Sequence, residues 1–420
     1  MRSLLSFYFI IFGCVGVLAI TSVLPLPLLL ALFILLCVWL RNSQERVLQV
    51  ELSLLSLVHV LFYCLIVIII SSYLLQTLEL GFSEKGLHHL LSYLIVIPAF
   101  YFAIYFGLHA SKISMDLVFK YIAYGVMWTA TFAIIEFVSK NYLHMGDVVD
   151  ELTLRAAYEP IYNISGHSFI RARSVAEESG HYAMYLVMFS PFALYYFYQA
   201  KSRFKTFICF FVMSLALATT FSASAFLSVS ISLVATTVLY LFQTKKNKVL
   251  KIILTALIGI MCITLFFFIS DSLHSFDAVF SKLTFEDTRS AQDRLRRWLF
   301  AFDLFQQKPF IGGGPGISAI LTDSGIVNLY LELLTQFGGL GFIVWIGLLF
   351  VFLKLIMRIK GAMRYVYFFS MSAALIHYAA ISNYWFPWLW NLFALISYHS
   401  HIQFQYNLQT KNGEVSLDEH

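Results

Sequence analysis

Long runs of apolar residues separated by polar connections dominate this chain of 420 residues. The runs approach the roughly 20 residues that a helix needs to cross a bilayer core of about 30 Å. Backbone groups within hydrocarbon must be satisfied inside the segment, so each run is predicted to be a helix. The pattern predicts an all-α polytopic membrane protein of about twelve transmembrane helices. They are expected near residues 4–20, 23–40, 52–75, 88–108, 117–138, 181–199, 206–221, 225–243, 250–270, 338–356, 365–382 and 384–400.

Two connections are long and divide the chain into six parts. These parts are spans one to five (1–138), a first loop (139–180), spans six to nine (181–270), a larger second loop (271–337), spans ten to twelve (338–400) and a tail (401–420). Short helices are expected within the two loops. Nearly all the charge on that side of the membrane falls in the loops, so any chemistry is expected there.

The short connections carry many lysines and arginines, for example Lys201, Arg203 and Lys205. Such loops face the cytoplasm under the positive-inside rule. An even number of spans then puts both termini in the cytoplasm. The sequence therefore predicts a polytopic inner-membrane protein whose two long loops, and any chemistry in them, face the non-cytoplasmic side.

Composition excludes a soluble globular protein, because 60% of the residues are hydrophobic and only 12% are charged. In a membrane protein the placement of the basic residues matters more than the net charge, which is +5 here. Membrane lipids, and not nucleic acid, are therefore the expected partners. Neither a metal nor a cofactor is predicted. Every cysteine lies in an apolar run without a CxxC neighbour, which favours packing over disulfides, zinc or thiol catalysis. The cysteines are Cys14, Cys37, Cys64, Cys209 and Cys262.

The first loop ends in a cluster of charges. Arg171 and Arg173 would project to the same side of an extended segment, about 6–7 Å apart. Two guanidinium groups so placed suit a diphosphate, since each offers a planar fork of donors. Glu177, Glu178 and His181 follow, and Glu177 can pair with His181 one helical turn away. The alternative is a set of charges that bind one another and lipid headgroups.

The second loop contains an amphipathic helix. Its apolar face comprises Leu295, Trp298, Leu299, Phe302 and Phe305. Asp293 lies opposite this face and can pair with Arg289 or Arg297. Arg294 lies closest to the edge of the apolar face and points inward, where a buried arginine needs an anionic partner. A substrate phosphate and a carboxylate of the first loop both remain possible partners.

Glycines follow this helix in the stretch 309–316, which includes Gly314. Such a loop permits a tight turn and can cradle phosphate with its amides, although it is not a Walker motif. Beyond it, Asn328, Glu332 and Gln336 share one face of a short helix that precedes Gly338.

Ionisable residues are rare inside the predicted spans. Glu136 and His377 are the main exceptions, and such groups are candidates for function. The alternative for His377 is a packing histidine with satisfied hydrogen bonds.

Three stretches together resemble the bacterial O-antigen polymerase and O-antigen ligase superfamily of multi-span C-type glycosyltransferases. Residues 171–183 are similar to the family's charged approach to a span. Residues 289–316 are similar to its arginine, tryptophan and glycine stretch. Residues 327–341 are similar to its asparagine, tyrosine and glycine ending. The order of the three on this topology is more specific than any one of them.

The sequence also departs from the family pattern. Ser179 stands where a proline is expected after the acid, and Ser222-Ala-Ser-Ala lacks the arginine often found at that turn. Val327 replaces the histidine that precedes the asparagine in ligases. The missing histidine favours a polymerase over a ligase.

The resemblance implies transfer of a glycan between lipid-linked repeat units without a metal. Arg173 and Arg294 would bind the diphosphate of undecaprenyl diphosphate, and Glu178 would act as general base. Glu177, Glu159 and Asp293 are alternative bases. Further substrate-binding residues are expected to be Arg171, Arg289, Arg297, Asn328 and Gly314.

A chain-length regulator is a further expected partner, with lipopolysaccharide biosynthesis as the process. The alternatives are an O-antigen ligase acting on the lipid A core, a lipid-linked oligosaccharide flippase and a structural membrane subunit. Nearly neutral span interiors argue against a flippase, and clustered arginines argue against a structural subunit.

Overall fold

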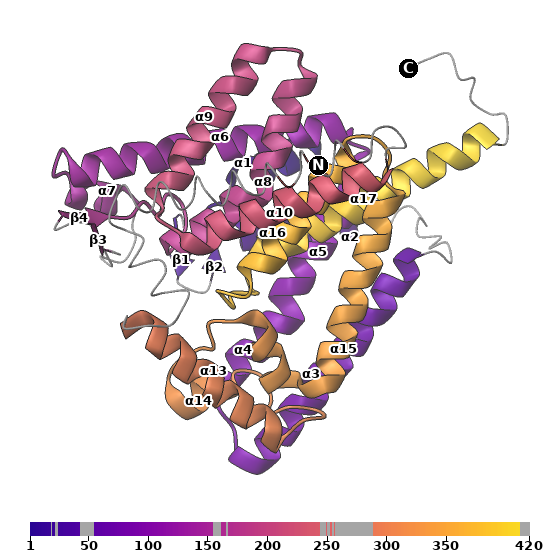
Figure 1. Ribbon diagram of the computed structural model, residues 1–420. Helices are drawn as coiled ribbons and strands as arrows, with labels where there is room; N and C mark the ends of the chain where they lie inside the picture. Colours follow the sequence, from indigo (N-terminus) through magenta and orange to yellow (C-terminus); the bar gives the residue numbers. More distant parts are fainter. Residues whose placement is uncertain are drawn as a thin grey trace.

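The computed structural model describes residues 1–17, 19–21, 24–42, 54–153, 161–164, 167–243, 249, 253, 256 and 289–411. Helices make up most of this part of the chain (Figure 1). They are α1 (Arg2–Ile11), α2 (Leu26–Asn42), α3 (Leu54–Leu80), α4 (Glu84–Leu91), α5 (Ile97–Ser111), α6 (Met115–Asn141), α7 (Gly146–Thr153), α8 (Ser179–Gln199), α9 (Arg203–Thr219), α10 (Ala223–Gln243), α13 (Arg289–Gln307), α14 (Ile317–Thr322), α15 (Leu329–Arg358), α16 (Met363–His377) and α17 (Pro387–Lys411). A π-helical turn, η1 (Ser92–Val96), joins α4 to α5.

Each predicted span within the described residues contains a helix, while the span expected at 250–270 lies largely outside them. Several helical stretches are long and apolar enough to cross a membrane. They are Ser56–Leu80, Glu84–Ser111, Met115–Asn141, Ala223–Gln243 and Leu329–Arg358. The prediction of a mainly helical, membrane-type fold is confirmed at this level.

The first predicted span was wrong in its second half, because α1 ends at Ile11. A Cβ atom at Gly16 would lie 2.5 Å from the carbonyl carbon of Ala176, so only glycine permits this close approach. The amide of Gly16 donates to the carbonyl of Val175 at 2.9 Å. The chain after α1 therefore leaves the helix and lies against the segment that leads into α8.

Two short antiparallel hairpins are an exception that the all-α prediction did not include. One pairs β1 (Ala19–Thr21) with β2 (Leu24–Pro25), and the other pairs β3 (Ile161–Ile164) with β4 (His167–Ile170). The second hairpin lies within the first predicted loop and leads directly to Arg171.

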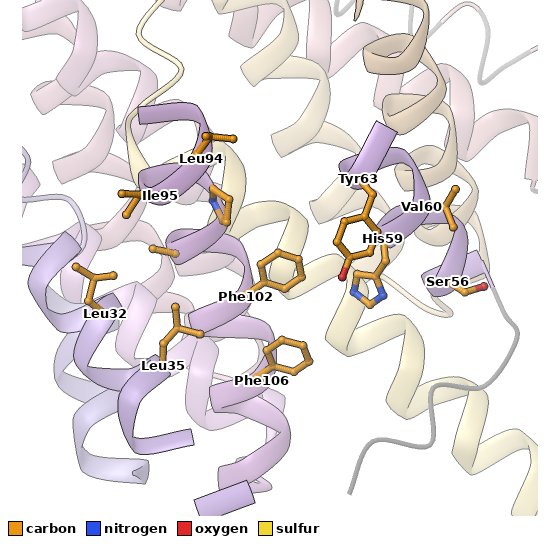
Figure 2. Close-up of a pocket in the computed structure, with 12 residues that line it drawn as sticks. Leu32, Leu35, Ser56, His59, Val60, Tyr63, Leu94, Ile95, Phe102 and Phe106 are labelled. Carbon is orange, nitrogen blue, oxygen red and sulfur yellow. The ribbon is translucent and has the colours of Figure 1, made fainter. Parts of the chain in front are cut away.

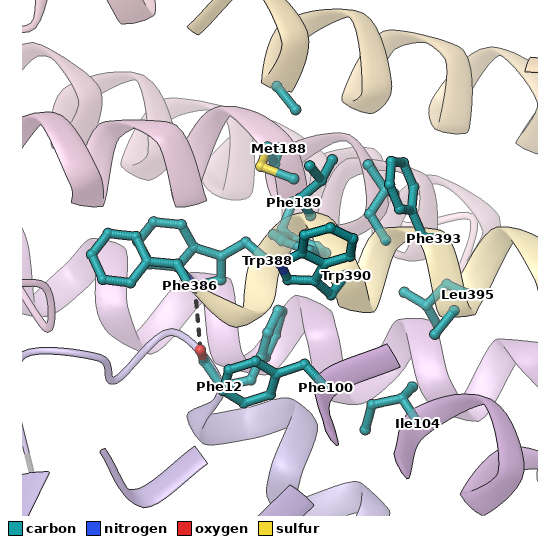
Figure 3. Packing of buried hydrophobic residues seen from close by; sticks show 14 of the residues in the cluster. Phe12, Phe100, Ile104, Met188, Phe189, Phe386, Trp388, Trp390, Phe393 and Leu395 are labelled. Carbon is teal, nitrogen blue, oxygen red and sulfur yellow. Dashed lines mark hydrogen bonds between the residues drawn. The ribbon is translucent and has the colours of Figure 1, made fainter. Parts of the chain in front are cut away.

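A cluster of aromatic side chains forms the core where α17 begins (Figure 3). Trp388 is fully buried, and its indole Nε1 donates to the carbonyl of Phe12 at 3.3 Å. This bond satisfies a carbonyl that the early end of α1 leaves free. Phe189 of α8 packs edge-on against the Phe12 ring, so the core fixes α1, α8 and α17 together.

A kink in α15 shapes the second loop. Gly338 has a φ of 63°, and a Cβ there would lie 2.3 Å from the carbonyl oxygen of Phe310. The kink frees carbonyls in the preceding turn, and the amides of Gly313 and Gly314 donate to those of Thr335 and Gln336 at 2.7 and 3.0 Å. As predicted, Glu332 and Gln336 lie on the helical turns before Gly338. The glycine stretch is thereby docked onto α15.

Candidate functional site

Three helix ends meet around the side chain of His377, the last residue of α16. Its Nε2 lies 3.5 Å from the hydroxyl of Ser224, in the first turn of α10. The same imidazole interacts with the backbone of Gly180, in the first turn of α8. His377 is 1% exposed, so it forms the buried floor of this region.

Charged side chains from both predicted loops lie next to this floor. Glu178 immediately precedes α8 and is exposed, and its carboxylate interacts with the guanidinium of Arg294 in α13. Burial lowers the pKa of Arg294, while the charge of Glu178 opposes that shift. Arg294 also acts electrostatically on His377. The structure therefore brings together two of the three residues predicted to be catalytic.

His181 completes the cluster from α8. Its imidazole interacts with Glu178 and with the side chain of Asn383, and it packs edge-on against the ring of Phe386. His181 is 5% exposed, and its Nδ1 has no hydrogen-bond partner among the described residues. The predicted pairing with Glu177 is replaced by these contacts with Glu178 and Asn383.

Glu177 is the second carboxylate at the rim. The surrounding protein removes water from the carboxyl group and so raises the pKa of Glu177, and the neighbouring charge of Glu178 raises it further. Its side chain remains exposed, as does that of Glu178. Glu177 therefore lies within the electrostatic influence of Glu178, the acid that interacts with Arg294.

Arg173, predicted beside Arg294, lies in a different setting. It is 2% exposed, and its guanidinium contacts Asp150 of α7 at 3.1 Å. Lys140 contacts the same carboxylate at 2.8 Å and Glu136 at 3.7 Å. The backbone amides of Arg173 and Ser174 donate to Glu136 at 3.0 and 2.6 Å. We refer to Glu136, Lys140, Asp150 and Arg173 as the buried ion cluster.

Arg171 has a partner on a different element from the Asp150 that Arg173 contacts. Its Nε donates to the carbonyl of Thr220 at 2.7 Å, and the Ala172 amide donates to Thr219 at 3.0 Å. This places Arg171 at the turn that leads through Ser222 into α10. Arg171 thus borders the region around Ser224.

The remaining arginines of α13 make contacts within the second loop. Arg297 contacts Asp293 at 2.6 Å, which confirms the predicted pairing, and its other nitrogen donates to the carbonyl of Gly325 at 3.0 Å. The hydrogen bonds that Arg297 and Arg296 donate to Asp293 lower the pKa of its carboxyl group. The side chain of Arg289 and residue Glu159 lie outside the described part of the structure.

Asn328 and Gly314 also have structural partners. The Oδ1 of Asn328 accepts from the amides of Tyr330 and Leu331 at 3.0 and 3.1 Å, which caps α15, and its Nδ2 donates to Ala379 at 3.0 Å. Gly314 is buried, and a Cβ there would lie 2.6 Å from Gln76. Its amide points to α15 and not to an open surface.

Ser224 and Asn383 are candidate residues that sequence reasoning did not single out. Ser224 is separated from His377 by 153 positions, and no periodicity relates residues so far apart. The only sequence signal was the rarity of ionisable groups within apolar runs, which drew attention to His377. Among the described residues, no group of three or more histidines, cysteines and acids gathers as a metal site.

A separate apolar cavity of about 830 Å³ lies between α2, α3 and the α5 region (Figure 2). Its wall includes Leu35, Val60, Phe102 and Phe106, together with the polar side chain of His59. None of the charged residues around Arg294 lines it. The cavity is therefore distinct from the charged site.

Several long apolar helices, with charged groups gathered at helix ends, define the class of this chain as a multi-pass membrane protein. A family model described as O-antigen ligase matches residues 208–346. The matched range contains Ser224, Arg294 and Asn328, and it ends inside α15. No curated protein matches the chain.

The match confirms the predicted resemblance to the O-antigen polymerase and ligase superfamily. Members of this class are glycosyltransferase-like enzymes with lipid-linked saccharide substrates in the membrane.

Proposed function

We propose that this chain is a polymerase of O-antigen or related repeat units in a bacterial inner membrane. It would transfer a growing glycan from undecaprenyl diphosphate to the non-reducing end of another lipid-linked repeat unit. The basic short loops support cytoplasmic termini and a site on the periplasmic side. Membrane lipids and a chain-length regulator are the further proposed partners.

The observation that carries this proposal is the electrostatic interaction between Arg294 of α13 and Glu178, which immediately precedes α8. The reaction requires a general base for the acceptor and a positive charge for the leaving diphosphate, and Glu178 and Arg294 offer these two functions. Glu178 accepts the proton of the acceptor hydroxyl, whose oxygen forms the new bond to the anomeric carbon. The bond from that carbon to the diphosphate breaks, and the diphosphate leaves with the electron pair.

Arg294 stabilises the charge on the departing diphosphate, and Arg171, at the turn that leads into α10, is an additional binding residue in this proposal. A positioned donor of this kind is commonly the largest catalytic contribution. In this proposal the arginines take the place of a metal. Arg173 keeps the segment before Glu178 in place through the buried ion cluster.

An O-antigen ligase is the second candidate, favoured by the description of the matching family model. Val327 at the position of the ligase histidine is the sequence feature that favours a polymerase.

The test is the lipopolysaccharide banding pattern of a strain from which the gene is cleanly deleted. A ladder that collapses to core plus one repeat unit would support a polymerase, because single units are still made and ligated. Loss of all O-antigen bands, with long polymer on the carrier lipid, would identify a ligase. Unextended units trapped in the cytoplasm would identify a flippase and overturn the proposal, as would an unchanged ladder.

A further inference from the structure

We propose that Ser224 binds the acceptor hydroxyl in this site and that His377 is the positioning residue that orients Ser224. The inference rests on the proposed function and adds a specific acceptor contact to it. It concerns residues on α10 and α16, whereas Glu178 and Arg294 come from the segment before α8 and from α13.

The surroundings of Ser224 leave its hydroxyl available to a ligand. Its Oγ lies 3.5 Å from Nε2 of His377 and 3.2 Å from the hydroxyl of Ser222. Ser224 is half-buried, whereas Ser222 is 3% exposed. A hydroxyl carries one donor and two acceptor positions, so contacts with these two neighbours leave capacity for a third.

Capping of α10 does not account for Ser224. Ser222 directly precedes the helix, at the position where a capping serine normally satisfies free amides. Ser224 is already inside the first turn. A serine within a helix more often bonds to its own helix, as Ser228 does with the carbonyl of Ala225 at 2.8 Å. Ser224 instead faces the imidazole on α16.

His377 is too deeply buried to touch substrate itself. It is 1% exposed, and the groups that face it are Ser224, the Gly180 backbone, His181 and Arg294. A buried imidazole costs free energy unless its polar atoms have partners, and the partners of His377 are the Gly180 backbone and Ser224. The contact with Gly180 holds the ring so that Nε2 faces Ser224, which is the arrangement that an orienting residue requires.

The position of the pair fits the acceptor and not the leaving diphosphate. Arg294 supplies the positive charge that a diphosphate needs, while Ser224 and His377 offer neutral hydrogen-bonding groups. Hydrogen bonds from hydroxyl and amide-like groups suit a sugar hydroxyl that must be held in one orientation for attack. Ser224 thus lies at the floor of the site through its contact with His377, and His377 in turn interacts electrostatically with Arg294.

The experiment uses the full-length protein in liposomes, with polymer-loaded undecaprenyl diphosphate as donor and a labelled single repeat unit on the same carrier as acceptor. Ser224→Ala is expected to raise the KM for the acceptor by about 2- to 10-fold, the loss of one hydrogen bond, with the KM for the donor unchanged. His377→Leu is expected to do the same. His377→Gln, which keeps a hydrogen-bonding group, should restore most of the loss.

A double variant tests whether the two residues act together. Because His377 acts through Ser224, S224A combined with H377L should cost no more than either change alone. Ser228→Ala and His399→Leu are matched controls, since Ser228 bonds within α10 and His399, on α17, lies 3.2 Å from the Tyr367 hydroxyl on α16. Both controls should leave the acceptor KM unchanged.

Independent, additive effects of S224A and H377L would overturn the inference, as would equal changes in both KM values or an unchanged acceptor KM in S224A. S224A removes a single oxygen, so it remains informative even if H377L fails to fold. Failure of the proposed function looks different, because the wild-type protein would then form no polymer from either lipid-linked substrate.

Discussion

Replacement of Arg173 by alanine tests whether this arginine has a structural or a catalytic role. The guanidinium is 2% exposed and contacts Asp150, whose side chain is 14% exposed, at 3.1 Å. Removal of one partner from a buried ion pair typically costs about 3–5 kcal/mol, because the remaining charge stays buried without compensation. Lys140 still contacts Asp150 at 2.8 Å in the variant, so a loss near the lower limit is expected.

The loss should spread to the segment before α8. Glu136 accepts the amides of Arg173 and Ser174, and Ser174 has a φ of 48°, a conformation that a serine adopts only when its surroundings enforce it. A weakened ion cluster would loosen this turn. We therefore expect Arg173→Ala to lower both the membrane abundance and the thermal unfolding temperature of the solubilised protein.

The assay compares Arg173→Ala with Arg173→Lys and with Arg294→Ala by immunoblotting of membranes and by thermal unfolding in detergent. Arg173→Lys keeps the charge but loses the planar fork, so an intermediate unfolding temperature is expected. Arg294→Ala should unfold like the wild type. Wild-type abundance and unfolding temperature in Arg173→Ala, combined with loss of polymer, would refute this reasoning and assign Arg173 to the diphosphate.

Four further outcomes are expected. Arg294→Ala should lower kcat by about 10²–10³-fold in the reconstituted assay, while Arg296→Ala, at a side chain 83% exposed on the same helix, should not; equal losses would contradict the role of Arg294. Glu178→Gln should lower kcat by about 10²–10⁴-fold, and a near-normal rate would exclude it as the base. Because burial and then Glu178 raise the pKa of Glu177, charging Glu177 destabilises the folded state. This cost is absent below its ordinary pKa of about 4.3 and grows as the pH rises through the higher folded-state pKa, so Glu177→Gln should raise the unfolding temperature at pH 7 and change it little near pH 4. Gly338→Ala should destabilise the protein by at least about 1–3 kcal/mol, measured by thermal unfolding, because its φ of 63° and the 2.3 Å approach of Phe310 both oppose a side chain.

The sequence by itself determined where most helices lie. It did not determine which face of α13 packs, because Leu295, Leu299 and Phe302 of the predicted apolar face are exposed and Ala301 is buried instead. Apolar runs specify helices because hydrocarbon leaves the backbone no other partner. Helical periodicity alone predicted that Arg294 points inward and that Arg297 lies one turn from Asp293. Both features are present in the structure. These predictions succeed because they depend on residues within a few positions of one another.

Tertiary structure decided what those residues meet. Two arginines two positions apart, Arg171 and Arg173, have partners on different elements, because Ser174 turns the chain and α7 supplies Asp150. The early end of α1 depends on contacts with residues near Ala176 and Trp388, far along the chain. Ser224 and His377 meet only because α10 packs on α16. Such contacts follow from the packing of whole helices, which no local pattern of residues encodes.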